Sequence, residues 1–393
     1  MENATPMLRQ YLEIKKLYPG TILFFRLGDF YEMFNEDAIV GSRELQITLT
    51  ARQKDSKNPI PMCGVPHHAA ANYISRLVKK GYRVAICEQA EAAGKGVKLV
   101  KREVVRVITP GTAIDPQLVE SDESVYLASV CGHGETFGAA FLELSTGEFS
   151  ATQVSGPDAW TKICERVESF SPRELLYPEP LKRLIEQSFG SGGGLDRKLP
   201  VIDGSEFYEM SQSSMTLTSQ EDTSFHVLDC DSLLKKQFGV NELTGFGLTE
   251  RAEAIRAAGA ALRYAQETQR TSAAHISSIS YFESNEFLVL DAVTLRNLEI
   301  VESQNTANKR FLFNVLNETV TGMGSRLLRS WLIRPSIKRS EIQTADDALK
   351  IGDFFQKKAD LVAKYRVCQF SNGGQPRLNL AAFYRRTNKP GSQ

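Results

Sequence analysis

The chain has 393 residues, of which 42% are apolar and 24% are charged, a composition that is ordinary for a globular protein. At about 100–200 residues per domain, this length predicts several domains. No apolar run approaches the ~18 residues of a membrane helix, and the first ten residues are polar, so the sequence predicts a cytoplasmic protein with no membrane partner. The formal net charge of zero is the sum of +5 for residues 1–115, −13 for residues 116–250 and +8 for residues 251–393, which indicates two segments able to approach a polyanion and one held away from it.

The first segment alternates predicted strands and helices, which is typical of an α/β domain. Strands are expected, from their β-branched and aromatic content, at residues 21–27, 45–50, 83–87 and 100–109. Helices are expected at residues 37–44 and 69–80, and Gly81 ends the second after two lysines in its last turn. Residues 51–61 are expected to form a polar loop, and Pro110-Gly111 begins an exit loop that places a boundary near residue 115.

The second segment, residues 116–245, is predicted to be another α/β domain. Strands are expected at residues 125–130, 137–154 and 174–177, and Ser145-Thr146-Gly147 forms a hairpin turn within the second of these. Helices are expected at residues 157–169 and 233–239, and the polar residues 204–225 are expected to be partly mobile.

The third segment, residues 246–393, is predicted to be mainly α. Thr249 is expected to cap a helix with one apolar face, formed by Ile255, Ala258, Leu262 and Ala265. A short extended piece is expected at residues 287–290, and a helix at residues 325–332 that Arg334-Pro335 ends. From about residue 346 the tail lacks a sustained apolar period, and Gly373-Gly374-Gln375-Pro376 would interrupt a helix.

No catalytic or metal site can be assigned from the sequence. It has no Gly-x-x-x-x-Gly-Lys-Ser/Thr motif, which would bind nucleotide phosphates, and its six cysteines show neither a Cys-x-x-Cys pair nor zinc spacing to a histidine. We therefore predict reduced thiols in the core. The side chains of His67 and His68 are expected to point apart, because adjacent residues of a strand or helix face different directions, so they do not suggest a metal site. Glu143 and Glu148 flank the predicted hairpin, whereas two-metal chemistry needs several converging carboxylates.

The most informative feature is the run Gly28-Asp29-Phe30-Tyr31-Glu32-Met33-Phe34. Aromatic residues at this density are usually core residues. In a strand, however, the two-residue period places Phe30 and Glu32 on one face and Tyr31 and Met33 on the other. A carboxylate in a core would need a partner, so an aromatic and a carboxylate on one face favour the edge of a ligand-binding surface.

Further motifs follow in order along the chain: Pro59 to Ala69, Val84 to Gln89, Val104 to Thr112, Thr244-Gly245-Phe246-Gly247, Asp291 to Ile300 and Thr321 to Pro335. With these motifs, residues 1 to about 345 resemble the N-terminal part of the bacterial MutS family of DNA mismatch-recognition proteins. So many ordered matches in one chain are far more specific than a lone Phe-x-Glu.

The resemblance implies a mismatch-binding α/β domain with a mixed sheet at residues 1–115, an RNase-H-like connector domain at 116–245, and an incomplete, mainly helical lever domain at 246–393. It implies that Phe30 stacks on a mismatched base from the minor groove and that Glu32 hydrogen-bonds that base. The implied partners are duplex DNA with mismatches or small loops, repair proteins that dock on the connector, and a second subunit in a homodimer; the implied location is the nucleoid in the cytoplasm.

The resemblance also implies that ATP and magnesium bind a C-terminal ATPase domain, which this sequence does not contain. We therefore expect no cofactor and no enzymatic activity in this chain. The chain is interpreted as a fragment, a truncated product or a sequence whose reading frame changed. The apolar face of the lever would then lack packing partners, which predicts association or fraying after about residue 250.

Residues 50–110 contain 12 Lys and Arg against 4 Asp and Glu, and supply candidates for contacts with the DNA backbone. These candidates, for which a solvated basic face is the alternative interpretation, are Arg52, Lys54, Lys98, Lys101, Arg102 and Arg106. Arg52 matches a DNA-contacting position of the family. Met62, in a predicted Pro-Met-Cys-Gly-Val-Pro loop, either touches the minor groove or packs in the domain.

Two rival hypotheses come from other functional classes. One is a metal-dependent nuclease built on residues 121–245. The other is a fragment that docks repair partners through its acidic connector and hardly binds DNA.

Overall fold

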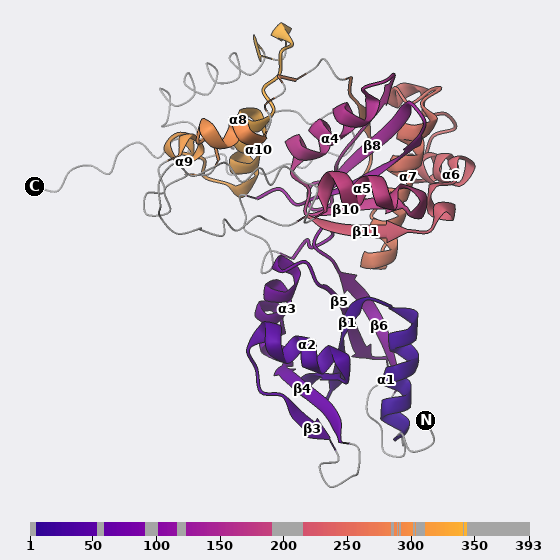
Figure 1. Ribbon diagram of the computed structural model, residues 1–393, viewed down its shortest axis with the longest axis vertical. Coiled ribbons are helices and arrows are strands. Elements are labelled where there is room, and N and C mark those ends of the chain that lie inside the picture. The colour runs from indigo at the N-terminus through magenta and orange to yellow at the C-terminus, as the bar shows by residue number, and fades with distance from the viewer. Residues whose placement is uncertain are drawn as a thin grey trace, which may run out of the picture. The chain divides into compact units, whose positions relative to one another are not determined.

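The computed structural model describes residues 5–52, 59–90, 101–115, 123–190, 215–283, 287–288, 290, 292–301, 303, 311–340 and 342–343 (Figure 1). It divides into two units, one formed by residues 1–120 and 125–281 and the other by residues 121–124 and 282–393. Within the described ranges, no helix has the length and apolar character that crossing a membrane would require. The predicted tail from about residue 346 lies outside the described residues.

A six-stranded mixed sheet forms the first domain, in the order β3-β4-β2-β1-β5-β6. Its strands are β1 (Thr21–Leu27), β2 (Phe30–Phe34), β3 (Thr50–Arg52), β4 (Ile60–Pro66), β5 (Arg83–Gln89) and β6 (Arg102–Ile108). β1 and β5 run parallel, and every other neighbouring pair is antiparallel. This arrangement confirms the predicted α/β domain with a mixed sheet.

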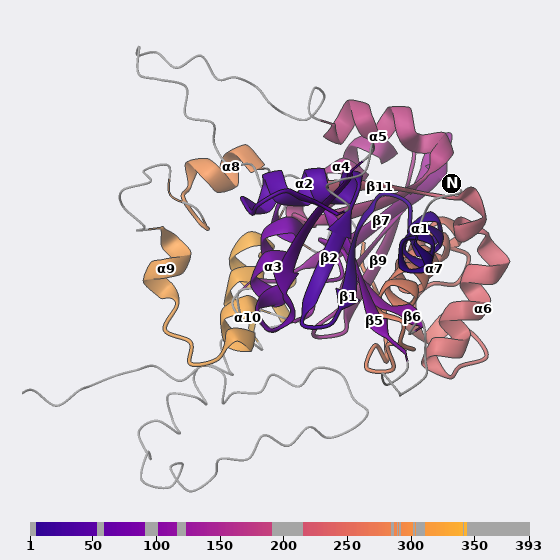
Figure 2. The same cartoon turned by 90° about the horizontal axis from the view of Figure 1, so that it is seen from below.

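Helices cover both faces of the first sheet, as Figure 2 shows. α1 (Pro6–Leu17) lies on one face and buries Leu8 and Tyr11 against it. α2 (Glu36–Leu45) and α3 (Ala70–Lys79) cover the other face, with the short 3₁₀ turn His67–Ala69 leading into α3. On the α1 side, the side chains of β1 and β5 are largely buried, and so is Phe34 of β2, whereas Phe30, Glu32 and the side chains of β4 on this face are at least partly exposed.

A buried carboxylate joins three elements of this domain. Asp37, in the first turn of α2, accepts hydrogen bonds from the Tyr11 hydroxyl at 2.7 Å and from the Leu23 amide at 3.1 Å, and pairs with Lys15 Nζ at 2.6 Å. The sequence analysis did not predict α1. Its apolar face is narrow and most of its residues are polar, so the helical period is weak in the sequence. The helix is stabilised by tertiary contacts, such as those of Tyr11 and Lys15 with Asp37.

Two predictions between α2 and α3 were wrong. Residues 45–49 are not a strand, because Leu45 ends α2 and Gln46 adopts a left-handed conformation with φ 57°; β3 begins only at Thr50. The predicted loop that contains Met62 is β4, although it carries two prolines and a glycine. Pairing with β2 on one side and β3 on the other outweighs the low strand propensity of these residues.

A second six-stranded sheet has the order β11-β10-β7-β8-β9-β12. Its strands are β7 (Tyr126–His133), β8 (Thr136–Glu143), β9 (Glu148–Ser155), β10 (Glu174–Pro178), β11 (Thr216–Gln220) and β12 (Ser280–Tyr281). β7, β8 and β9 form an antiparallel meander with the predicted hairpin, and the other neighbouring pairs are parallel. The second α/β domain is thereby confirmed; β11 was missed within a stretch predicted to be partly mobile.

Helices pack on both faces of the second sheet. α4 (Ala159–Phe170) stacks Phe170 on Phe141, with ring centroids 3.9 Å apart. α7 (Ala252–Gln269) packs on the opposite face and is flanked by α6 (Val227–Phe238). α5 (Lys182–Phe189) follows β10.

α7 belongs to the core of the second sheet, whereas the sequence analysis placed it in the third segment. A Cβ atom at Gly138 on β8 would lie 2.2 Å from the Glu253 carbonyl oxygen, so only glycine permits this approach. The predicted cap at Thr249 is also wrong. The helix begins at Ala252, and Gln153 Oε1 of β9 accepts the Glu253 amide at 3.0 Å.

The segment after β6 packs into the second domain through one buried carboxylate. Glu174, at the start of β10, accepts hydrogen bonds from the Gly111 amide at 3.0 Å and from the Thr109 hydroxyl. It also accepts hydrogen bonds from the hydroxyls of Thr218 and Tyr264, each at 2.7 Å. Residues 109–113 are buried, so the linker is an integral part of the core.

The described part of the second unit is largely helical, with α8 (Ala292–Asn297), α9 (Leu312–Leu316) and α10 (Gly322–Ile333). Thr321 Oγ1 accepts the Gly324 amide at 3.1 Å and caps α10, which ends before Arg334-Pro335 as predicted. Several apolar side chains of this unit are exposed: Leu298, Leu312, Val315, Leu316, Val320 and Met323.

Replacing Glu174 by alanine is expected to lower the free energy of unfolding of the second domain by about 3 kcal/mol. The substitution removes a buried carboxylate and leaves its four hydrogen-bond donors without their acceptor. Urea unfolding followed by far-UV circular dichroism measures the effect. Glu179, an exposed carboxylate just after the same strand, is the control, and E179A should leave the transition unchanged. Equal midpoints for E174A and the parent would contradict the assigned role.

Candidate functional site

β2 displays Phe30 on the surface while it buries its neighbours. The Phe30 side chain is 47% exposed, and every other Phe, Tyr or Trp in the described ranges is buried or half-buried. Tyr31 and Met33 are buried on the opposite face with α2 and α3. Phe34, on the Phe30 face, is buried against α1. The predicted alternation is confirmed, and Phe30 lies at the end of the strand beyond the reach of α1.

A tight β1–β2 turn sets the position of Phe30. Gly28 has φ 59°, a conformation that glycine adopts without steric cost. Arg26 Nε donates to the Gly28 carbonyl within the turn. The His67 amide donates to the Asp29 carbonyl at 2.8 Å, which ties the turn to the end of β4.

Glu32 shares the face of Phe30 and lies one pleat further along β2. Its cross-strand neighbours are Phe25 on β1 and Gly64 on β4. A Cβ atom at Gly64 would lie 3.5 Å from Glu32 Cγ, so the glycine leaves the space above β4 open beside the carboxylate. Gly64 is not recognisable as a site residue from the sequence, since only the strand register places it next to Glu32.

Arg52 is the basic partner of Glu32. Its Nη1 lies 3.3 Å from Glu32 Oε2, and its guanidinium lies 5.9 Å from the centroid of the Phe34 ring. Burial raises the pKa of the Glu32 carboxyl above its ordinary value, and the charge of Arg52 acts in the opposite direction. Glu32 is thus a half-buried carboxyl held closer to protonation than a solvated glutamate.

Met62 lies on β4 in the same region. It pairs with Phe34 on one side and with Thr50 on the other. The side chain is partly buried and packs against the α1-side core. Of the two alternatives left open by the sequence, packing is therefore observed, and part of the side chain remains accessible.

The remaining basic candidates separate into different environments. Lys101 is exposed and pairs with Glu103 at 2.6 Å. Arg106 lies on the opposite face of the sheet from Phe30 and pairs with Asp115 at 3.6 Å. Lys54 and Lys98 lie outside the described residues.

Arg102 is a core residue, which corrects its assignment as a backbone-contact candidate. Its side chain packs over the Phe25 ring, and the residue is only 8% exposed. Its Nε donates to the Arg26 carbonyl at 2.7 Å and its Nη1 to Gln10 Oε1 at 3.1 Å. Burial also lowers its pKa. The guanidinium therefore supports the hydrophobic core and presents no free face to a phosphate.

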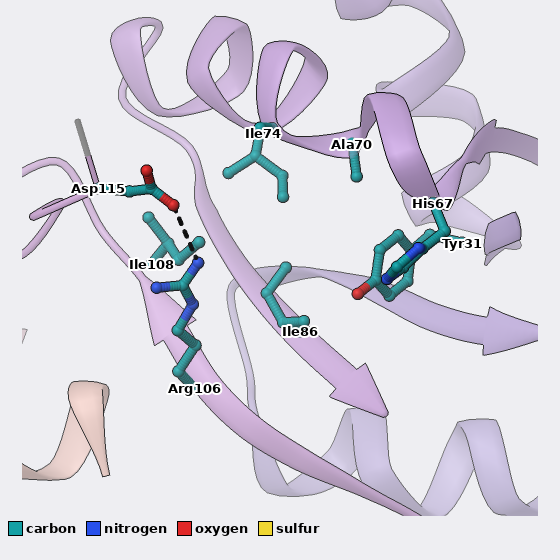
Figure 3. Close-up of a pocket in the computed structure, with 9 residues that line it drawn as sticks. Tyr31, His67, Ala70, Ile74, Ile86, Arg106, Ile108 and Asp115 are labelled. Carbon is teal, nitrogen blue, oxygen red and sulfur yellow. Dashed lines mark ion pairs between the residues drawn. The ribbon is translucent and has the colours of Figure 1, made fainter. Parts of the chain in front are cut away.

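The opposite face of the first sheet carries a small hollow of about 140 Å³ (Figure 3). Its apolar floor is formed by side chains from α3, β5 and β6, and its other lining residues include Tyr31, His67, Arg106 and Asp115. The Tyr31 hydroxyl donates to Glu88 Oε1 on β5. This pair was not predicted, because a single sequence does not reveal which side chains meet across two strands.

The second-domain carboxylates act as structural groups in this structure. Glu143 is buried, and its oxygens accept hydrogen bonds from the Ser145 hydroxyl and from the Thr146 amide at 2.7 Å. Glu148 accepts a hydrogen bond from the Tyr126 hydroxyl at 2.8 Å. Within the residues that the structure describes, no three His, Cys, Asp or Glu side chains form a group that could hold a metal ion.

Three segments of the chain match known families: MutS domain I over residues 5–117, MutS domain II over residues 125–277 and MutS domain III over residues 293–366. The third match extends past residue 346, where the sequence analysis placed the start of an atypical tail. The second match contains α7, in agreement with its packing.

Curated relatives extend this similarity. The chain is 43% identical over 354 residues to the DNA mismatch repair protein MutS of Solibacter usitatus, which covers 88% of this chain and 38% of that protein. It is 44% identical over 349 residues to MutS of Myxococcus xanthus, with 88% and 37% covered. It is 40% identical over 367 residues to MutS of Symbiobacterium thermophilum, with 92% and 39% covered. The chain thus spans about two fifths of the length of these relatives.

Replacing Arg52 by alanine is expected to raise the Glu32 pKa further, because the charge of Arg52 lowers it. When folding raises the pKa of a carboxyl, the stability of the fold decreases as pH rises from the unfolded pKa through the folded pKa. R52A should therefore extend this decrease in stability to higher pH. Carbon-detected NMR titration of the Glu32 carboxyl measures the shift.

The matched control for this titration is Arg43→Ala, which removes one of the two basic partners of Glu44, the other being Lys80, and should leave Glu32 unchanged. An unchanged or lower Glu32 pKa in R52A would show that the pair has no electrostatic role.

Proposed function

The chain belongs to the MutS family, and we propose that its first domain binds duplex DNA at mismatched or looped-out base pairs by inserting Phe30 from the minor groove. The observation that carries this proposal is the exposed Phe30 ring on the same strand face as Glu32. A planar apolar ring that remains in water on a rigid sheet is suited to a partner with a planar surface of its own.

Phe30 would discriminate through the cost of opening the base stack. An aromatic ring placed against a base recovers ~1–3 kcal/mol of stacking. Insertion costs a few kcal/mol of unstacking and kinks the duplex. A mispaired or unpaired base has already lost part of its stacking and pairing, so this cost is lower there. The preference then comes from local deformability more than from the identity of the base.

Glu32 would add a second selection beside the ring. A carboxylate is repelled by phosphates unless a base edge offers it a hydrogen bond. The raised pKa of Glu32 brings its neutral form closer to physiological pH, and a neutral carboxyl also donates a hydrogen bond. Mismatched bases expose edges that intact pairing occupies, so this contact is available mainly at a defect.

Basic side chains would supply general affinity for the backbone. Arg52 is partly exposed and lies beside Glu32, where it both balances the carboxylate and is available to a phosphate. Lys101 is exposed and directly precedes β6, an edge strand of the first sheet. Lys54 and Lys98 are further proposed contacts. These contacts position the duplex without reading its sequence.

Replacing Phe30 by alanine is expected to reduce the preference for a G·T or one-base-loop duplex over a matched duplex by roughly tenfold, the order of one lost base stack. Weak general binding should remain. Fluorescence anisotropy with the two duplexes at fixed salt measures both affinities. F30L, which keeps an apolar side chain without a ring, should resemble F30A.

Leu17→Ala is the control for loss of an exposed apolar side chain in the same domain, and it should retain the parental preference. The proposal fails if F30A and the parent discriminate equally.

A further inference from the structure

We propose that Tyr31, Glu88 and His67 form a brace on the back of the sheet that positions Phe30 for insertion, an inference that rests on the proposed function. Tyr31 and His67 line the hollow on the face opposite Phe30, and both approach Glu88, so we assign the three as positioning residues rather than as groups that touch DNA.

The first part of the brace is the hydrogen bond between Tyr31 and Glu88. Tyr31 directly follows Phe30, so a rotation of β2 that moves one ring moves the other in the opposite sense. The Tyr31 hydroxyl donates to Glu88 Oε1 on β5, and β1 lies between the two strands. Burial, followed by the bond to Glu88, raises the pKa of Tyr31, which keeps this hydroxyl a donor. The bond therefore opposes rotation of β2 relative to the centre of the sheet.

The second part is His67, which holds the turn and the ring together. Its backbone amide donates to the Asp29 carbonyl at 2.8 Å, one residue before Phe30. Its ring centroid lies 5.4 Å from that of Tyr31, and its Nε2 lies 4.0 Å from Glu88 Oε1. His67 also follows Pro66, the cross-strand partner of Phe30. One residue thus contacts the turn, the buried ring and the carboxylate.

The Tyr31 ring packs against Phe24, with ring centroids 5.8 Å apart, and the hollow in Figure 3 borders it on another side. Tyr31 and His67 lie together at one side of this space of about 140 Å³, and the ion pair of Arg106 and Asp115 lies at the other. A ring that borders an open space has fewer contacts to hold its rotamer than a ring in a filled core. The hydrogen bond to Glu88 adds a directional restraint on the hydroxyl end of the ring.

A fixed ring matters because insertion between bases depends on alignment. A mobile Phe30 would lose conformational entropy when it stacks, and that loss would weaken mismatch binding. Binding to matched DNA, which does not require insertion, would not be affected. The brace is therefore expected to act on discrimination and not on general affinity.

The experiment compares Y31F, E88L and E88Q in the full 393-residue chain, with 2-aminopurine placed beside a G·T mismatch. Y31F and E88L should each lower the mismatch preference roughly fivefold, the order of one hydrogen bond. The fluorescence change that reports stacking at the mismatch should fall with it, while matched-duplex affinity stays constant. E88Q retains an acceptor for the Tyr31 hydroxyl and should restore most of the preference.

The double variant Y31F/E88L should lose no more preference than either single variant, because both remove the same bond. The matched control is the Tyr126–Glu148 hydrogen bond of the second domain, so Y126F and E148L should retain the parental preference.

The outcomes separate this inference from the proposed function. If F30A retains full discrimination, the proposed function fails. If F30A loses discrimination while Y31F and E88L keep it, the brace is refuted and the proposed function stands. A parallel loss of affinity for both duplexes with a lower thermal midpoint would also overturn the brace, since it would indicate general destabilisation.

Discussion

The two-residue period of β2 is the constraint on which the site depends. One strand of five residues must bury Tyr31 and Met33 with α2 and α3 and also bury Phe34 against α1. These three anchors leave no freedom of register, because a shift by one residue would expose the buried side chains and bury Glu32. Phe30 is therefore exposed as a direct result of how its neighbours pack. Burial of the three anchors outweighs the cost of leaving the Phe30 ring in water.

Local patterns were sufficient to predict the part of the site that lies within one strand. Alternation placed Phe30 and Glu32 on a common face, and helical periodicity with a terminal glycine located α3. What the sequence did not reveal depends on pairing between distant segments. β4 forms because β2 and β3 flank it, and Gly64 and Glu88 enter the site only through strand register and contacts across the sheet. Neither is visible without knowledge of which strands are neighbours.

Charge was the least reliable guide to position. Arg52 and Arg102 both belong to a basic stretch, yet Arg52 pairs with Glu32 at the surface while Arg102 lies over Phe25 inside the domain. A count of charges does not distinguish them, because an arginine with a long apolar stem is accommodated in either setting. α7 illustrates the same limit for domain assignment. Its apolar face was recognised, but contacts between distant segments, such as the close approach of Gly138 to Glu253, identify the sheet on which it packs.

The buried linker has a mechanical consequence. Residues 109–112 are secured by Glu174 through a hydroxyl and an amide, and the Gln269 side chain donates to the Thr112 carbonyl at 2.6 Å. A force applied to β6 would therefore act on several hydrogen bonds at once. A flexible linker without such bonds would only be extended. Tension exerted on the first domain would pass through these bonds to β10 and α7 of the second domain. The joint therefore behaves as a stiff coupling, able to transmit displacement as well as to connect the chain.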